Sequence, residues 1–93
     1  MARYLESGMR RDCCALLYGA GEVRAQTLKT RLADHYDSRL DPRQFYERLD
    51  ALVDAGHVER RVDGVHDVYA LTDAGARALE AHVAWLDGQV RDE

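Results

Sequence analysis

The chain has 93 residues, of which 46% are hydrophobic and 32% are charged, and its 13 Lys and Arg against 17 Asp and Glu give a formal net charge of −4. This composition is typical of one soluble globular domain, and the length excludes an enzyme with separate cofactor and substrate lobes. The net charge excludes a strongly basic nucleic-acid coat protein.

Two short helices are predicted before residue 40. Apolar side chains recur at helical spacing in residues 9–18, at Met9, Cys13, Leu16 and Leu17. The stretch GAGE at residues 19–22 ends that helix, because glycine disfavours helical backbone. A second helix is expected from about residue 23 to residue 35, with Ala25, Leu28 and Leu32 facing inward. Residues 36–40 are expected to form a turn.

The third helix has the clearest start signal in the chain. Asp41 is a good N-cap, Pro42 suits the first helical position, and Gln44 stands where a capping box has Glu or Gln. One apolar stripe follows, formed by Phe45, Leu49, Leu52 and Val53. Gly56 is expected to end the helix as a left-handed residue.

A β-hairpin and a last helix complete the chain. Residues 58–62 alternate as a strand does, and Asp63-Gly64 predicts a two-residue type I′ turn before a return strand at residues 65–71. Thr72 is expected to cap a helix from Asp73 to about residue 89, with the Asp73 carboxylate near the positive end of the helix dipole.

This order of three helices, a hairpin and a last helix is the plan of a winged helix-turn-helix, a mainly α fold with a small β-hairpin. In that motif the second helix of the pair enters the DNA major groove. The third helix leaves Arg43, Gln44, Tyr46, Glu47 and Asp50 outside its apolar stripe. Arg43 can pair with guanine and Gln44 with adenine, whereas the alternative for any one of these side chains is a solvated helix face.

Phosphate contacts are expected from side chains around that helix. Residues 1–62 carry 11 basic and 10 acidic side chains, against 2 and 7 in residues 63–93, so an anionic partner should meet the first part of the chain. The expected contacts are Arg39, Arg60 and Arg61, with Arg24 and Thr27 early in the second helix and His66 near the hairpin tip. Alternation along the strand indicates that only one of the two hairpin arginines faces DNA, and leaves open which.

The third helix resembles that of the PadR-like transcriptional regulators. Residues 40–52 read LDPRQFYERLDAL and residues 55–58 read AGHV, whereas the family has Leu-Ser-Pro-Gly-Thr-Leu-Tyr-x-x-Leu-x-x-Leu before a glycine exit. Residues 68–75, VYALTDAG, resemble the family's Tyr-x-Leu-Thr-x-x-Gly join. The resemblance implies a dimeric DNA-binding repressor or regulator, with Arg43, Gln44 and Tyr46 facing DNA. The chain departs from the family in its short wing, in Arg43-Gln44 replacing Gly-Thr, and in lacking His-Gly-Tyr near Arg24.

The last helix carries a second apolar stripe. Leu79, Val83, Leu86 and Val90 are spaced by 4, 3 and 4 residues, the pattern of paired helices, and Trp85 and Ala78 widen it. We therefore expect residues 1–71 to be a DNA-binding domain and residues 72–93 a dimerisation helix, within one compact domain. The alternative is that the stripe folds back onto its own core. Tyr4 and Leu5 are expected to pack nearby, and a two-fold dimer would present half-sites roughly 34–36 Å apart.

The remaining residues indicate no catalytic or metal chemistry. Four histidines lie in separate elements, and no nucleophile set, paired acids or phosphate loop is present, so neither an enzyme nor a cofactor is expected. Adjacent Cys13 and Cys14 suit neither a disulfide framework nor a zinc pair. They would serve a redox sensor if Arg10 and Arg11 lowered a thiol pKa; the alternative is buried small residues.

The sequence thus predicts a homodimeric, sequence-specific DNA-binding transcription regulator. We expect a cytoplasmic protein, because the longest apolar run, residues 13–18, cannot span a bilayer. An effector and the choice between repression and activation are left open, although the resemblance favours a repressor. The alternative function is a winged-helix module that binds a protein through its acidic surface, without contacting DNA.

Overall fold

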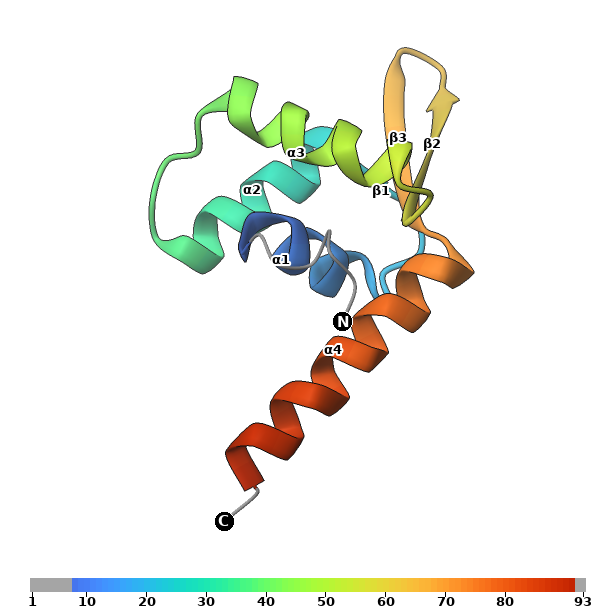
Figure 1. Ribbon diagram of the computed structural model, residues 1–93. Helices are drawn as coiled ribbons and strands as arrows, with labels where there is room; N and C mark the ends of the chain where they lie inside the picture. Colours follow the sequence, from blue (N-terminus) through green and yellow to red (C-terminus); the bar gives the residue numbers. More distant parts are fainter. Residues whose placement is uncertain (1–7, 92–93) are drawn as a thin grey trace.

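The structure, a computed structural model, describes residues 8–91, so that Tyr4 and Leu5 lie outside the described residues. Four helices and three strands follow one another along the chain (Figure 1). They are α1 (Gly8–Leu17), β1 (Val23–Arg24), α2 (Ala25–Tyr36), α3 (Pro42–Asp54), β2 (Val58–Asp63), β3 (His66–Leu71) and α4 (Asp73–Arg91). Within residues 8–91, no helix combines the length and the apolar character needed to cross a bilayer.

The core lies where α1, α2 and α3 pack together beside the sheet (Figure 1). Its large, fully buried side chains come from all of these elements and are Leu17, Leu28, Leu32, Phe45, Leu49, Leu52, Val58 and Tyr69. The inward positions predicted for the second and third helices are therefore confirmed. Val53 is the exception in the predicted α3 stripe, because it is only half-buried and packs against the edge of this core.

Both ends of α3 are fixed by local chemistry. The Asp41 carboxylate accepts a hydrogen bond from the Arg43 amide at 3.2 Å, which confirms Asp41 as the N-cap. The capping box was wrong, because the hydrogen bonds of the described residues include none from the Gln44 side chain back to Asp41. At the other end Gly56 has a φ of 81°, and its amide donates a hydrogen bond to the Val53 carbonyl. The His57 amide donates one to the Leu52 carbonyl. This is a Schellman motif, in which a left-handed glycine is favoured.

The sheet has three antiparallel strands in the order β1-β3-β2. β1 was missed by the sequence analysis: Val23 pairs with Tyr69 and Arg24 with Val68, so α2 begins only at Ala25. The predicted turn was also wrong. Asp63 pairs with His66, so the two-residue loop is Gly64-Val65 and only Gly64 has a positive φ, as in a type II′ turn.

The start of α4 is tied to the segment that joins α3 to β2. The hydroxyl of Thr72 accepts a hydrogen bond from the Gly75 amide at 3.0 Å and donates one to the Gly56 carbonyl at 2.6 Å, which confirms Thr72 as the cap. Gly75 lies so close to this segment that a Cβ there would be 2.0 Å from the His57 carbonyl oxygen. From this fixed start α4 passes α1, and its C-terminal half extends away from the rest of the molecule (Figure 1).

Candidate nucleic-acid interface

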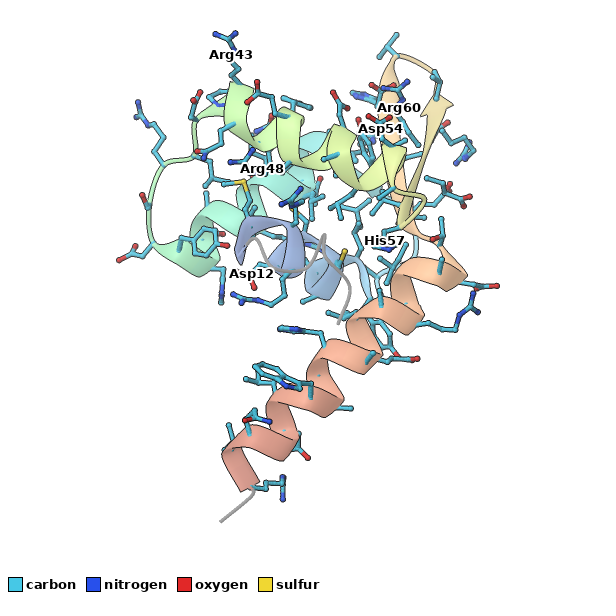
Figure 2. All side chains as sticks on the ribbon, viewed as in Figure 1. Asp12, Arg43, Arg48, Asp54, His57 and Arg60 are labelled. Carbon is cyan, nitrogen blue, oxygen red and sulfur yellow. The ribbon has the colours of Figure 1, made fainter. Side chains whose placement is uncertain are left out.

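The N-terminal end of α3 presents polar side chains on the side opposite to the core. Phe45, Leu49 and Leu52 anchor the inner side of the helix, which leaves Arg43 and Gln44 exposed in its first turn. Figure 2 shows the Arg43 side chain pointing away from the molecule at the free end of α3. The exposed side of α3 thus offers a donor-rich end that nothing in residues 8–91 covers.

Three of the predicted contact residues meet in one hollow. A cavity of about 250 Å³ lies between the start of α2, α3 and the hairpin, and Arg24, Tyr46 and His66 all line it. The Tyr46 ring is held by an edge-to-face contact with Phe45, with ring centroids 5.1 Å apart. The sequence analysis placed Arg24 in the second helix, but Arg24 pairs with β3 and therefore belongs to β1. Thr27 is exposed in the first turn of α2.

The two hairpin arginines lie on opposite faces of the sheet. Arg60 pairs with Tyr69 and Arg61 with Val68, and directly opposite residues of antiparallel strands share a face. Arg60 therefore lies on the core face, and in Figure 2 it is found between the hairpin and the C-terminal end of α3, near Asp54. Burial raises the pKa of Tyr69, and a hydrogen bond from Arg60 opposes that rise.

Arg61 is held by the loop that precedes β1. Its guanidinium donates two hydrogen bonds to the Glu22 carboxylate, at 2.6 and 2.7 Å, and these bonds lower the pKa of Glu22. This two-bond pairing compensates the charge of Arg61 within the protein, although the side chain stays 55% exposed. Arg39, by contrast, is exposed in the loop before α3.

An acidic series on α3 was given no role in the sequence analysis. Arg43, Glu47, Asp50 and Asp54 are spaced by 4, 3 and 4 residues, so they form one outer ridge, and all four are exposed. We call these four residues the α3 ridge. Both the helical spacing of these residues and their place opposite to the apolar stripe were readable in the sequence.

The α4 stripe divides where the helix leaves the core. Leu79 is 6% exposed and belongs to the core, whereas Val83, Trp85, Leu86 and Val90 are 47–75% exposed. Trp85 stacks on the buried His82, with ring centroids 6.0 Å apart. A hollow of about 490 Å³ between α1 and α4 adjoins the stripe and is lined mainly by apolar atoms; it includes Ala15, Tyr18 and Ala84.

The cysteines do not form a reactive site. Cys13 and Cys14 are both free and completely buried, which agrees with the alternative of small core residues. Burial raises the pKa of Cys13 to about 12 and that of Cys14 to about 11. The redox-sensor alternative, which needs a lowered thiol pKa, is therefore contradicted. Within residues 8–91, no three His, Cys, Asp or Glu side chains are grouped so that they could share a metal ion.

No protein-family model matches the chain, and no curated protein matches it in sequence. Solved structures do match. RosR of H. salinarum has a TM-score of 0.85 at 24% identity, over 94% of this chain and 79% of RosR. The homodimeric winged helix-turn-helix DNA-binding domain Mb0332 of Mycobacterium bovis, a possible ArsR-family regulator, has a TM-score of 0.79 at 22% identity, over 98% of this chain and 79% of that one.

PadR of Bacillus subtilis, solved in complex with operator DNA, has a TM-score of 0.70 at 21% identity, over 83% of this chain and 47% of PadR. These structural neighbours are winged-helix transcription regulators. The predicted fold class is confirmed: four helices and a three-stranded antiparallel sheet in a winged-helix arrangement.

Proposed function

We propose that the chain is a homodimeric, sequence-specific DNA-binding transcription regulator of the PadR-like kind, acting as a repressor in the cytoplasm rather than as an enzyme. The observation that carries the proposal is the exposed Arg43-Gln44 pair at the N-terminal end of α3, a helix whose C-terminal end lies beside the hairpin. In winged helix-turn-helix proteins this helix enters the major groove and its N-terminal residues reach base edges. Arg43 would pair with guanine and Gln44 with adenine, each contact contributing about 1–3 kcal/mol of discrimination.

Phosphate groups would be bound around this helix. Arg39 precedes α3, and Arg24 and Thr27 stand at the start of α2, where free amides and the helix dipole favour an anion. Of the two hairpin arginines we assign a phosphate contact to Arg60, since Glu22 compensates Arg61. Arg61 would instead tie β2 to the loop before β1 through Glu22.

Tyr46 and His66 would serve the same surface from the hollow beside α3. Both line the cavity shared by α2, α3 and the hairpin, and Val65 at the hairpin tip is 94% exposed. An aromatic hydroxyl and an imidazole at this place suit contacts with sugar and phosphate oxygens.

The dimer would form through residues 72–93. Val83, Trp85, Leu86 and Val90 leave an apolar stripe uncovered on the half of α4 that extends from the core, and the adjoining hollow continues the apolar surface onto α1. Trp and large aliphatic side chains exposed together are typical of interfaces. Mb0332 is homodimeric and B. subtilis PadR was solved with operator DNA, which supports the same assembly and ligand here.

One observation favours a second candidate function. Three of the four α3 ridge residues are acidic, and an acidic surface there suits a basic protein partner better than a phosphate backbone. In that case the chain would be a winged-helix interaction module without direct DNA contact.

A salt titration of DNA binding separates the two functions. Fluorescence anisotropy with labelled promoter and random duplexes should give an affinity that falls steeply as salt rises, because each neutralised phosphate releases counterions. An absence of binding to both duplexes at low salt would refute the DNA-binding proposal.

Sedimentation of Trp85→Glu tests the dimer. We expect the variant to have half the mass of the wild-type assembly, since a charge would be buried at the interface. Gly88→Glu is a matched control on the same helix, because Gly88 is outside the stripe and has open space around it. A Trp85→Glu variant of unchanged mass would contradict the assignment of this interface.

A further inference from the structure

The direction in which each α3 side chain points ranks the residues by how deeply they would enter a groove. The centre of the buried side is given by Phe45, Leu49 and Leu52. At about 100° per residue, Glu47 lies about 170° from that centre and Arg43 about 150°. Gln44 and Tyr46, in contrast, lie only about 90–110° away and therefore flank the helix. Asp54, at the C-terminal end, lies about 170° away as well, so Glu47 and Arg43 form the apex of the N-terminal part of α3.

The Glu47 carboxylate is uncommitted. Among residues 8–91 it has no hydrogen bond and no ion pair, whereas Glu22, Glu80 and Asp87 are each held by a neighbouring side chain. Asp50, which follows on the same ridge, is close enough to Tyr69 to act on its pKa and so belongs to the base of the hairpin. Glu47 is the ridge acid nearest to Arg43 and has no internal structural role.

From this geometry we propose, on the basis of the proposed DNA-binding function, that Glu47 is a specificity-determining residue that reads cytosine in the major groove. An ionised carboxylate only accepts hydrogen bonds, and the cytosine N4 amino group is a donor that carboxylates recognise in the major groove. Guanine presents only acceptors there, and thymine presents an acceptor and a methyl group, so both are rejected; adenine places its N7 acceptor beside the N6 amino group, which disfavours an acceptor-only carboxylate.

Arg43 supplies the complementary contact. It lies four residues before Glu47, which is about 6 Å along the helix axis, and base pairs are spaced by about 3.4 Å. The two side chains would therefore contact base pairs about two steps apart, with Arg43 on a guanine and Glu47 on a cytosine. Glu47 also repels phosphates and so weakens binding to unrelated sequences. It would therefore raise specificity both by contacting cytosine and by disfavouring other DNA.

Selection from a randomised duplex pool, followed by sequencing, tests this role. The wild-type protein should select a half-site in which one column prefers cytosine by about tenfold, the size of one good base contact. Glu47→Gln should convert that column to adenine, which glutamine pairs with, and leave the others unchanged. It should also tighten binding to random DNA. Asp34→Asn, which removes the same charge from an exposed position on α2, should leave the selected half-site unchanged.

The outcomes separate this inference from the proposed function. If Glu47→Gln and the wild type select the same half-site, the role of Glu47 is refuted while sequence-specific binding stands. If the wild type selects no sequence at all, both the role of Glu47 and the proposed function are overturned. Because Glu47 is exposed and unpaired, circular dichroism should show an unchanged fold for the variant.

Discussion

Replacing Gly75 with alanine should separate the start of α4 from the segment between α3 and β2. The new Cβ would lie 2.0 Å from the carbonyl oxygen of His57 and 2.9 Å from both its carbonyl carbon and Leu71 Cδ1. Ordinary contacts begin at 3.4 Å, so the two backbones would have to part by about 1.4 Å. The same His57 carbonyl accepts the Thr72 amide at 3.0 Å, so this movement also strains a hydrogen bond.

The magnitude follows from three opposing contributions. Overpacking costs about 1–3 kcal/mol and a weakened hydrogen bond about 0.5–1.5 kcal/mol. The higher helix propensity of alanine returns about 1 kcal/mol. We therefore expect Gly75→Ala to lower the free energy of unfolding by about 0.5–3.5 kcal/mol, equivalent to several degrees in Tm.

Gly88→Ala is the matched control, because Gly88 is in the same helix with nothing within 4 Å of a built Cβ. It should raise the free energy of unfolding by about 0.5–1 kcal/mol. Urea unfolding followed by far-ultraviolet circular dichroism, at one protein concentration for all variants, measures both changes. If Gly75→Ala proved as stable as Gly88→Ala, the close approach of these two backbones would be refuted.

Three further predictions concern the cap of α4, the thiols and a tyrosine. Thr72→Val should lower the free energy of unfolding by about 1–2 kcal/mol because it removes the cap, whereas Thr72→Ser should retain most of it; equal losses in urea unfolding would contradict the capping role. Cys13 and Cys14 should resist a thiol reagent at pH 8 in the folded protein and react on unfolding, since burial raises both pKa values; rapid labelling without unfolding would contradict their burial. Burial and the hydrogen bond to Asp12 raise the pKa of Tyr36 from 10.0 to about 12, so its contribution to stability is complete below pH 10 and is lost as the pH rises towards 12. Tyr36→Phe should remove that part of the alkaline loss, and identical alkaline unfolding curves would contradict it.

Elements set by neighbouring residues were predictable from the sequence. The bounds of α3 follow from Asp41, Pro42 and Gly56, whose effects act within one helical turn. The Thr72 cap followed in the same way. The order of three amphipathic helices, a hairpin and a last helix was sufficient to predict the fold class.

Features set by distant partners were not predictable. β1 is only two residues long and exists because Val23 meets Tyr69, 46 positions later in the chain. The hairpin loop contains Gly64 in either register, so the choice of Gly64-Val65 depends on how the strands pair. Which hairpin arginine is paired with a carboxylate likewise depends on Glu22, which no strand pattern connects to Arg61.

The residue types of the candidate site were predictable from the sequence, but the surroundings of each side chain were less so. Arg43 and Gln44 were expected on the exposed side of α3, and both are exposed there. The direction of Glu47, opposite to the buried stripe, was already readable from that stripe, whereas its lack of an internal partner required the structure. In α4 the sequence stripe continues from Leu79 to Leu86 without interruption, but the core ends between them, so only the latter faces outward.

The affinity of Arg43→Ala for a selected operator duplex tests the central claim most directly. The variant should lose about tenfold or more in affinity for that duplex and discriminate less against a single substitution of the contacted guanine. Arg77→Ala, which removes the same charge from an exposed position on α4, should bind as the wild type does. If Arg43→Ala also binds as the wild type does, α3 is not the element that reads DNA.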